Sequence, residues 1–247
     1  MYNPFTLEGK TILVTGASAG IGRAIAITCS KMGACIFAVG RNAERLENTI
    51  SLLEGIGHKS AICDLTSRKD VGAFVSELPK LDGVIHCAGI GQRIPCKQLT
   101  ENDVDEVMDI NFKAPVLLQT ELLSQKKINK GASIVFIASI ASWSPSIANS
   151  VYSASKGAII SYAKCLGLEL ASRQIRVNCI SPAMVWTELA ATNGLNEAVL
   201  KADEKRYPLK RYGQPEDIAH LAIYMLSDAS SWMTNSNVEI TGGGNLS

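Results

Sequence analysis

The segment Lys10-Thr-Ile-Leu-Val-Thr-Gly-Ala-Ser-Ala-Gly-Ile-Gly22 decides the fold of this 247-residue chain. It opens with a short apolar run of β-branched side chains that stops at Gly16, which is typical of a buried strand. After the glycine-rich turn, apolar residues recur at helical spacing from Ile21 to Met32, and Gly33 is placed to end that helix. A strand, a glycine turn and a helix in this order can bind a pyrophosphate, because glycine lets the backbone approach it at the helix N-terminus. The alternative is that the glycines only serve the turn.

The same alternation of strands and helices continues to the end of the chain. Apolar strands are expected at 34–39, 60–63, 83–87, 133–138, 175–180 and 237–240, and helices at 42–53, from 67, at 101–124, 152–170 and 215–226. Strands that are apolar throughout need cover on both faces, so this pattern predicts a doubly wound parallel sheet of about seven strands in a Rossmann-like, three-layer α/β/α fold. No linker or repeat divides the sequence, which predicts one domain over residues 1–247.

Composition and charge argue against several classes of partner. The net charge of +1 lacks the basic excess typical of nucleic-acid binding. No unbroken apolar run reaches the roughly 18 residues that suggest a membrane span, and no secretory signal is evident, so we expect a cytoplasmic protein. The seven cysteines form no C-x-x-C pair and the three histidines are far apart, so the sequence predicts no metal site.

A second informative segment runs from Ser139 to Lys156 and ends in Tyr152-Ser-Ala-Ser-Lys156. On a helix, Tyr152 and Lys156 share one face because they are four residues apart. An ammonium near a phenol stabilises the phenolate, and such a phenol can pass a proton to or from an oxygen near neutral pH. For an isolated Y-x-x-x-K, a tyrosine and a lysine on a helix surface are the alternative.

The glycine turn at 15–22 and the Tyr152 motif together resemble the short-chain dehydrogenase/reductase family, and the similarity extends over nearly the whole chain. The resemblance implies a nicotinamide-dependent enzyme that interconverts a carbonyl and a secondary alcohol. It implies a catalytic set of Asn111, Ser139, Tyr152 and Lys156. In that set Ser139 holds the substrate oxygen, Lys156 binds the nicotinamide ribose and Asn111 connects the lysine through water to solvent. Local chemistry alone leaves Ser142 and Ser144 as competitors of Ser139.

The resemblance also implies a set of cofactor-binding residues that follow successive strands. They are Gly16, Ser18, Ala19, Gly20, Ile21, Gly22, Arg41, Asp64, Leu65, Ala88, Gly89, Tyr152, Lys156, Pro182, Val185 and Thr187. For Asp64, a role in the turn before a helix is an equally good local explanation. The chain departs from the family at Cys87, where an asparagine usually ties the neighbouring backbone together. A thiol is a poorer donor, so we expect different packing there.

Arg41 bears on the choice between the two nicotinamide cofactors. In doubly wound folds an acidic residue after the second strand binds the ribose 2′-hydroxyl of NAD, whereas an arginine accommodates the 2′-phosphate of NADP. Here Gly40 replaces the acid and Arg41 follows it, so NADP(H) is favoured over NAD(H). The alternative is a solvated Arg41 in an enzyme that uses NAD without the acid.

Substrate selection is expected in residues 187–212, which the resemblance identifies as a substrate lid. The lid would have an apolar underside, and a packed surface helix is the alternative. The residues of that underside are Leu189, Leu195, Val199, Leu200 and Tyr207. Trp143, Ile147 and Asn149 are further candidates for selecting the substrate.

Residues 207–219 are similar to those of 3-oxoacyl-[acyl-carrier-protein] reductases, so the substrate could be carried on an acyl-carrier protein. Four basic residues, Lys126, Lys127, Lys130 and Arg173, could form a surface for such an acidic carrier or could simply be solvated. A sugar, polyol or hydroxysteroid dehydrogenase and a non-catalytic NADP-binding scaffold or sensor are the other hypotheses. The resemblance further implies a homo-oligomer, a dimer through the 101–124 and 152–170 helices or a tetramer.

Overall fold

The computed structural model describes residues 2–188 and 197–244, which build a seven-stranded sheet in the order β3-β2-β1-β4-β5-β6-β7. All neighbouring strands are parallel, so the predicted doubly wound sheet is confirmed. The strands are β1 Thr11–Thr15, β2 Cys35–Gly40, β3 Lys59–Ile62, β4 Leu81–His86, β5 Ile128–Ile137, β6 Arg176–Pro182 and β7 Asn237–Ile240.

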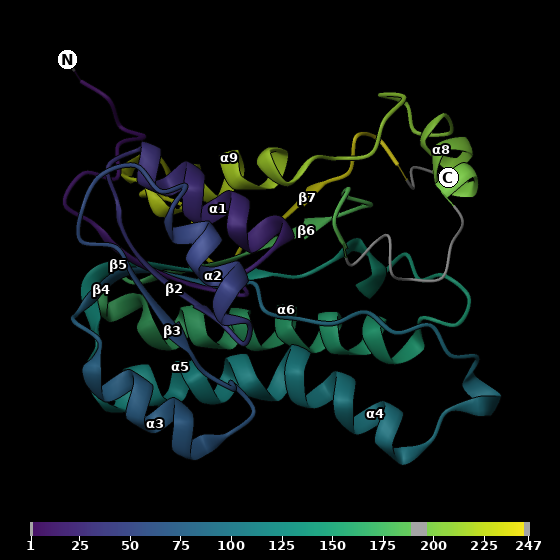
Figure 1. Ribbon diagram of the computed structural model, residues 1–247, viewed down its shortest axis with the longest axis horizontal. Coiled ribbons are helices and arrows are strands. Elements are labelled where there is room, and N and C mark those ends of the chain that lie inside the picture. The colour runs from purple at the N-terminus through teal and green to yellow at the C-terminus, as the bar shows by residue number, and fades with distance from the viewer. Residues whose placement is uncertain (1, 189–196, 245–247) are drawn as a thin grey trace.

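Helices cover both faces of the sheet (Figure 1). The helices in the described part of the chain are α1 Gly20–Lys31, α2 Ala43–Ile50, α3 Arg68–Glu77, α4 Glu101–Met108, α5 Ala114–Ser124, α6 Ser150–Leu170, α8 Glu197–Glu204 and α9 Pro215–Leu226. One layer holds α1, α2 and α9, and the opposite layer holds α3 to α6. Within the described residues, no helix is both long and apolar enough to cross a membrane.

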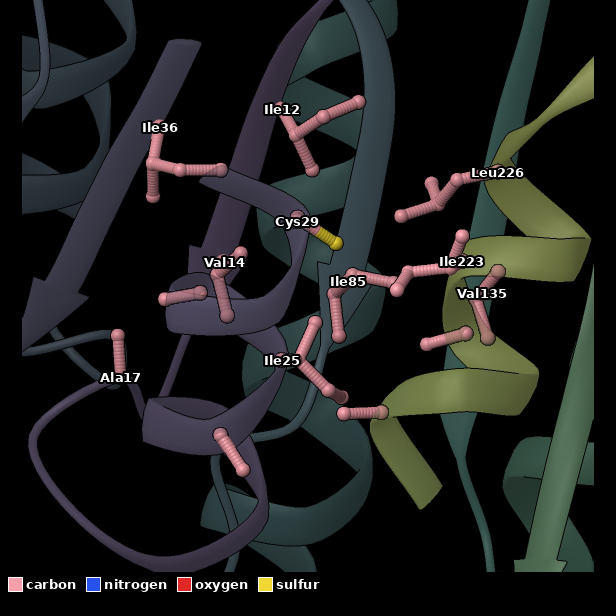
Figure 2. Packing of buried hydrophobic residues seen from close by; sticks show 14 of the residues in the cluster. Ile12, Val14, Ala17, Ile25, Cys29, Ile36, Ile85, Val135, Ile223 and Leu226 are labelled. Atoms are coloured by element: carbon pink, nitrogen blue, oxygen red, sulfur yellow. The ribbon is translucent and has the colours of Figure 1, made fainter. Parts of the chain in front are cut away.

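The alternation of side chains along each strand divides the core into two halves. Ile12 and Val14 pack on the side of α1 and α9, whereas Leu13 between them packs on the side of α3, α5 and α6. Figure 2 shows the first half, where Ile25 of α1, Ile85 of β4 and Ile223 of α9 belong to one packed cluster. Because the central strands β1, β4 and β6 bury side chains on both faces, the sheet is fixed between the two layers and its strand ends are held in register.

Two predicted elements differ most from the structure. The helix expected at 101–124 is interrupted between α4 and α5 by a π-helical turn, Asp109–Lys113. The strand expected at 133–138 starts earlier, at Ile128, because the polar residues Asn129 and Lys130 at its exposed beginning give no apolar signal.

Candidate active site

Six strands end at a common cleft of about 690 Å³. Its lining comes from the segments that directly follow β1, β2, β3, β4, β5 and β6, which is where open α/β sheets bind ligands. All of the residues predicted to contact a cofactor line this cleft, and so do Ser139, Tyr152 and Lys156. Asn111 does not line it but lies directly behind its wall.

The glycine turn leaves no room for side chains at two positions. Gly16 has φ +68°, and a Cβ there would lie 2.9 Å from the Ala88 backbone. A Cβ on Gly22 would collide with the Gly16 carbonyl oxygen. Arg23 braces the turn from behind, since its guanidinium donates a 2.6 Å hydrogen bond to the Ser18 carbonyl. The backbone amides at the start of α1 are therefore open to a ligand in the cleft.

Thr15, the last residue of β1, fixes the backbone after β4. Its hydroxyl accepts hydrogen bonds from the Cys87 and Ala88 amides at 3.0 and 3.1 Å and donates to the Ile85 carbonyl at 3.3 Å. Burial raises the pKa of the Cys87 thiol to about 12, so this thiol stays protonated at neutral pH. Cys87 thus lines the cleft as a small neutral side chain.

Arg41 and Asp64 lie at the end of the cleft formed by β2 and β3. Asp64 accepts hydrogen bonds from the Thr66 amide at 3.0 Å and the Thr66 hydroxyl at 2.8 Å. These bonds, together with the nearby Arg41 charge, hold the pKa of Asp64 below its usual value. The Asp64 carboxylate therefore stabilises the turn that precedes α3. In the described part of the chain, Arg41 donates no hydrogen bond to this carboxylate or to any other group.

Lys156 and Tyr152 lie on the first turns of α6, at the opposite end of the cleft. Lys156 is 6% exposed, and its ammonium donates a 2.8 Å hydrogen bond to the Ile137 carbonyl at the end of β5. It lies 5.7 Å from the centre of the Tyr152 ring. This one bond leaves donors of the ammonium available to a ligand, since an ammonium has three.

Asn111 lies in the π-helical turn and is 2% exposed. Its side chain accepts a hydrogen bond from the Ile90 amide at 2.8 Å and donates to the Ile90 carbonyl at 2.9 Å and to the Ser155 hydroxyl at 3.2 Å. A Cβ on Gly89 would lie 3.1 Å from the Asn111 amide oxygen and 3.5 Å from the Lys156 nitrogen. Asn111 therefore holds the segment after β4 against α6, beside Lys156.

The three serines that compete for the substrate oxygen differ in their surroundings. The Ser139 side chain accepts a 3.1 Å hydrogen bond from the Ala141 amide and lines the cleft, with its proton free to donate. The Ser142 hydroxyl donates to the Ser139 carbonyl and does not line the cleft. Ser144 lines it as well. Geometry therefore rules against Ser142 and leaves Ser139 and Ser144.

The expected lid falls partly within the described residues. Leu200 and Tyr207 are buried and pack with Tyr212 and Trp186. Glu204 of α8 joins this cluster by accepting hydrogen bonds from the Trp186 indole at 2.6 Å and the Tyr212 amide at 3.1 Å. Val199 lines the cleft, whereas Leu189 and Leu195 lie outside the described residues.

Other sequence expectations are corrected by the structure. Of the candidates for substrate selection, Asn149 lines the cleft, but Trp143 and Ile147 do not. The basic residues expected to form a carrier surface lie at the amino-terminal ends of β5 and β6, away from the cleft. Lys127 donates to the Ser76 and Leu78 carbonyls and Arg173 donates to the Ile128 carbonyl, so both brace loops.

The roles of Thr15 and Arg23 were missed by sequence reasoning because a threonine closing a strand and an arginine on a helix carry no motif. Arg93, which lines the cleft in the segment after β4, was missed as well. Its position shortly after Gly89, in a segment expected to reach the cofactor, was the sequence signal that could have identified it as a cleft residue.

The cleft fits a dinucleotide, because a glycine turn with no room for a side chain at Gly16 or Gly22 lies at one strand end and a Tyr–Lys pair lies beyond it. The fold and this arrangement define the class of nicotinamide-dependent oxidoreductases.

Comparisons with known proteins agree with this class. Residues 16–245 match the family model described as enoyl-(acyl carrier protein) reductase. The chain is 35% identical over 237 residues to the 3-oxoacyl-[acyl-carrier-protein] reductase FabG of Rickettsia felis, covering 96% of this chain and 97% of that protein. It is 30% identical to the human dehydrogenase/reductase SDR family member 4, with 96% and 88% covered. A dehydrogenase/reductase from Sinorhizobium meliloti superposes with a TM-score of 0.88 at 32% identity, with 98% and 97% covered. The chain belongs to the short-chain dehydrogenase/reductase family.

Proposed function

We propose that this protein is an NADP(H)-dependent oxidoreductase that interconverts a carbonyl and a secondary alcohol. The observation that carries the proposal is the buried Lys156 ammonium, held by the Ile137 carbonyl 5.7 Å from the Tyr152 ring, at the end of a cleft that also holds Arg41. A cation fixed beside a phenol is what a proton exchange at a substrate oxygen requires.

The nicotinamide, when bound, supplies a hydride to the carbonyl carbon or takes one from the alcohol carbon. In the reductive direction the Tyr152 hydroxyl gives a proton to the substrate oxygen. Lys156 stabilises the phenolate that remains, and its unused donors bind the ribose hydroxyls. Ser139 donates a hydrogen bond to the substrate oxygen and stabilises charge that develops there. Asn111 positions Lys156 by holding Ile90 and Ser155 beside it.

The preference for NADP(H) rests on Arg41. Its guanidinium is exposed at the adenosine end of the cleft and unpaired within the described residues, while Asp64 is engaged by Thr66. An acid at position 40 would be crowded, because even a Cβ there lies 3.2 Å from the Ser18 hydroxyl. These observations favour a 2′-phosphate over a free 2′-hydroxyl.

A 3-oxoacyl thioester is a candidate substrate because the Rickettsia relative is named for that activity. A carrier protein docked on the basic residues at the start of β5 would be separated from Ser139 by the length of that strand. β5 has ten residues, which corresponds to roughly 30 Å. We therefore do not propose that a carrier protein docks on that surface.

We do propose that the protein forms a homo-oligomer through α6, because Leu168 of that helix is 72% exposed.

The experiment follows NADPH oxidation with acetoacetyl thioesters, simple ketones and a panel of sugars, with Tyr152→Phe as the control. We expect turnover of at least one carbonyl class and none with Tyr152→Phe. Oxidation of sugars, polyols or hydroxysteroids with NADP+ would favour the dehydrogenase alternative. Tight NADP+ binding without turnover of any substrate would refute the enzyme and favour a scaffold or sensor.

A further inference from the structure

Arg93 lies in the segment that follows β4, and it lines the cleft together with Asn149 and Tyr152. The backbone on its C-terminal side is anchored, because the Ile94 amide donates a 2.8 Å hydrogen bond to the Ala148 carbonyl, next to the start of α6. On its other side, the side-chain amide of Gln92 donates to the Asp103 carboxylate at 3.2 Å. Arg93 is thus carried on a segment fixed to α4 and to the residues that precede Tyr152.

The Arg93 side chain has no partner among the described residues, although acidic side chains are present in the cleft. Three carboxylates occur in the described lining, Asp64, Glu188 and Asp203, and each is engaged elsewhere. Asp64 is bonded to Thr66, Glu188 pairs with Arg45 at 2.6 Å, and Asp203 accepts from the Tyr212 hydroxyl at 2.8 Å and from Arg206 at 3.3 Å. The cleft therefore supplies no anion to Arg93.

The other two cationic side chains that line the cleft within the described residues already have roles in the proposed function. Lys156 is bonded to the Ile137 carbonyl beside Tyr152, and Arg41 lies at the adenosine end. Arg93 belongs to the Tyr152 end, and the side chain of Asn149, at the N-terminus of α6, makes no capping hydrogen bond. A guanidinium, an uncommitted amide and the Ser144 hydroxyl together offer several donors in the cleft that Tyr152 also lines.

We infer that Arg93 binds an anionic group of the substrate, a carboxylate or a phosphate, and that the substrate is an oxo acid, a hydroxy acid or a phosphorylated ketone or alcohol. This inference rests on the proposed function and deepens it. A guanidinium matches both groups through paired hydrogen bonds, whereas a neutral acyl thioester offers it no charge. Charge-assisted pairs of this kind favour the anionic substrate by about 10- to 100-fold in kcat/KM over a neutral substrate of the same shape.

The test compares matched pairs of substrates with NADPH: 2-oxo, 3-oxo and 4-oxo acids against their methyl esters, and dihydroxyacetone phosphate against dihydroxyacetone. Each pair is measured on the wild type, on Arg93→Gln and on Arg93→Lys. The control variant is Lys97→Gln, an exposed cation of the same segment that does not line the cleft. The acid pairs test whether the anionic group is a carboxylate, and the phosphate pair tests whether it is a phosphate.

We expect the wild type to prefer the charged member of one substrate pair. Arg93→Gln should lose that preference by about 10- to 100-fold while turnover of the neutral member stays unchanged, and Arg93→Lys should retain part of the preference. Lys97→Gln should behave as the wild type. Turnover of ketones and esters without preference for any charged partner, or an equal loss on both members of a pair, would overturn the inference and leave the proposed function intact. Calorimetric titration of the NADP+-loaded protein with the same oxo acids needs no turnover. Equal binding to the wild type and Arg93→Gln, or no binding to the wild type, would also overturn it.

Discussion

Replacing Arg41 by alanine should lower kcat/KM for NADPH about 10- to 150-fold and leave kcat/KM for NADH nearly unchanged. The guanidinium is exposed and unpaired in the described part of the chain, so it can give a 2′-phosphate charge-assisted hydrogen bonds that together contribute about 1.5–3 kcal/mol. Since a tenfold change corresponds to about 1.4 kcal/mol, this free energy gives the expected range. NADH has no phosphate at that position and loses nothing. The assay is initial-rate kinetics with both cofactors at one fixed carbonyl concentration.

Two further variants make this measurement decisive. Arg41→Lys keeps the charge but loses the paired geometry, so its loss should be intermediate. Arg45→Ala removes a neighbouring arginine whose guanidinium is already paired with Glu188 at 2.6 Å, and the ratio of NADPH to NADH efficiency should not change. Unchanged NADPH kinetics in Arg41→Ala, or equal losses with both cofactors, would refute the assignment of the 2′-phosphate to Arg41.

Three other outcomes are expected. Tyr152→Phe should lower kcat at least about 100-fold while NADP+ binding, measured by calorimetry, is retained; substantial turnover would contradict its role in proton transfer. Asn111→Ala leaves the half-buried Ile90 amide and carbonyl without their side-chain partner and should cost about 2–4 kcal/mol, seen as a Tm lower by roughly 5–15 °C. Burial lowers the pKa of His86 from 6.5 to about 4, so between these pH values the unfolded chain binds a proton that the folded chain does not bind. Stability should therefore fall by about 3 kcal/mol as the pH drops from 6.5 to 4, and urea titrations of His86→Asn should show a shallower decline.

Much of the fold could be predicted because its determinants are local. The central strands contain short apolar runs, and the polar residues Asn42, Ser67 and Thr100 that precede helices do cap them, accepting hydrogen bonds from the third helical amide. The glycine turn and the Tyr152 motif are likewise local patterns, and the parallel sheet brings them to one cleft because all of its strands end on the same side.

What could not be predicted depends on contacts between distant segments. The π-helical turn at Asn111 gives no sequence signal, because its side chain is satisfied by Ile90 and Ser155, which are 21 and 44 residues away. Lys127 looked like a surface charge, yet its ammonium donates to the carbonyls of Ser76 and Leu78, about 50 residues earlier. Arg93 carried no motif, and only the cleft places it near Tyr152.

The segment after β4 explains how the site accommodates Cys87 in place of the asparagine that the family usually carries. The Thr15 hydroxyl uses its one donor and both acceptor positions, on Ile85, Cys87 and Ala88. Asn111 holds both backbone groups of Ile90. The backbone on both sides of Gly89 is therefore fixed by two side chains, Thr15 and Asn111, without help from the side chain of residue 87. A small, neutral thiol is sufficient there, because the hydrogen bonds that tie the backbone are made from β1 and from the π-helical turn.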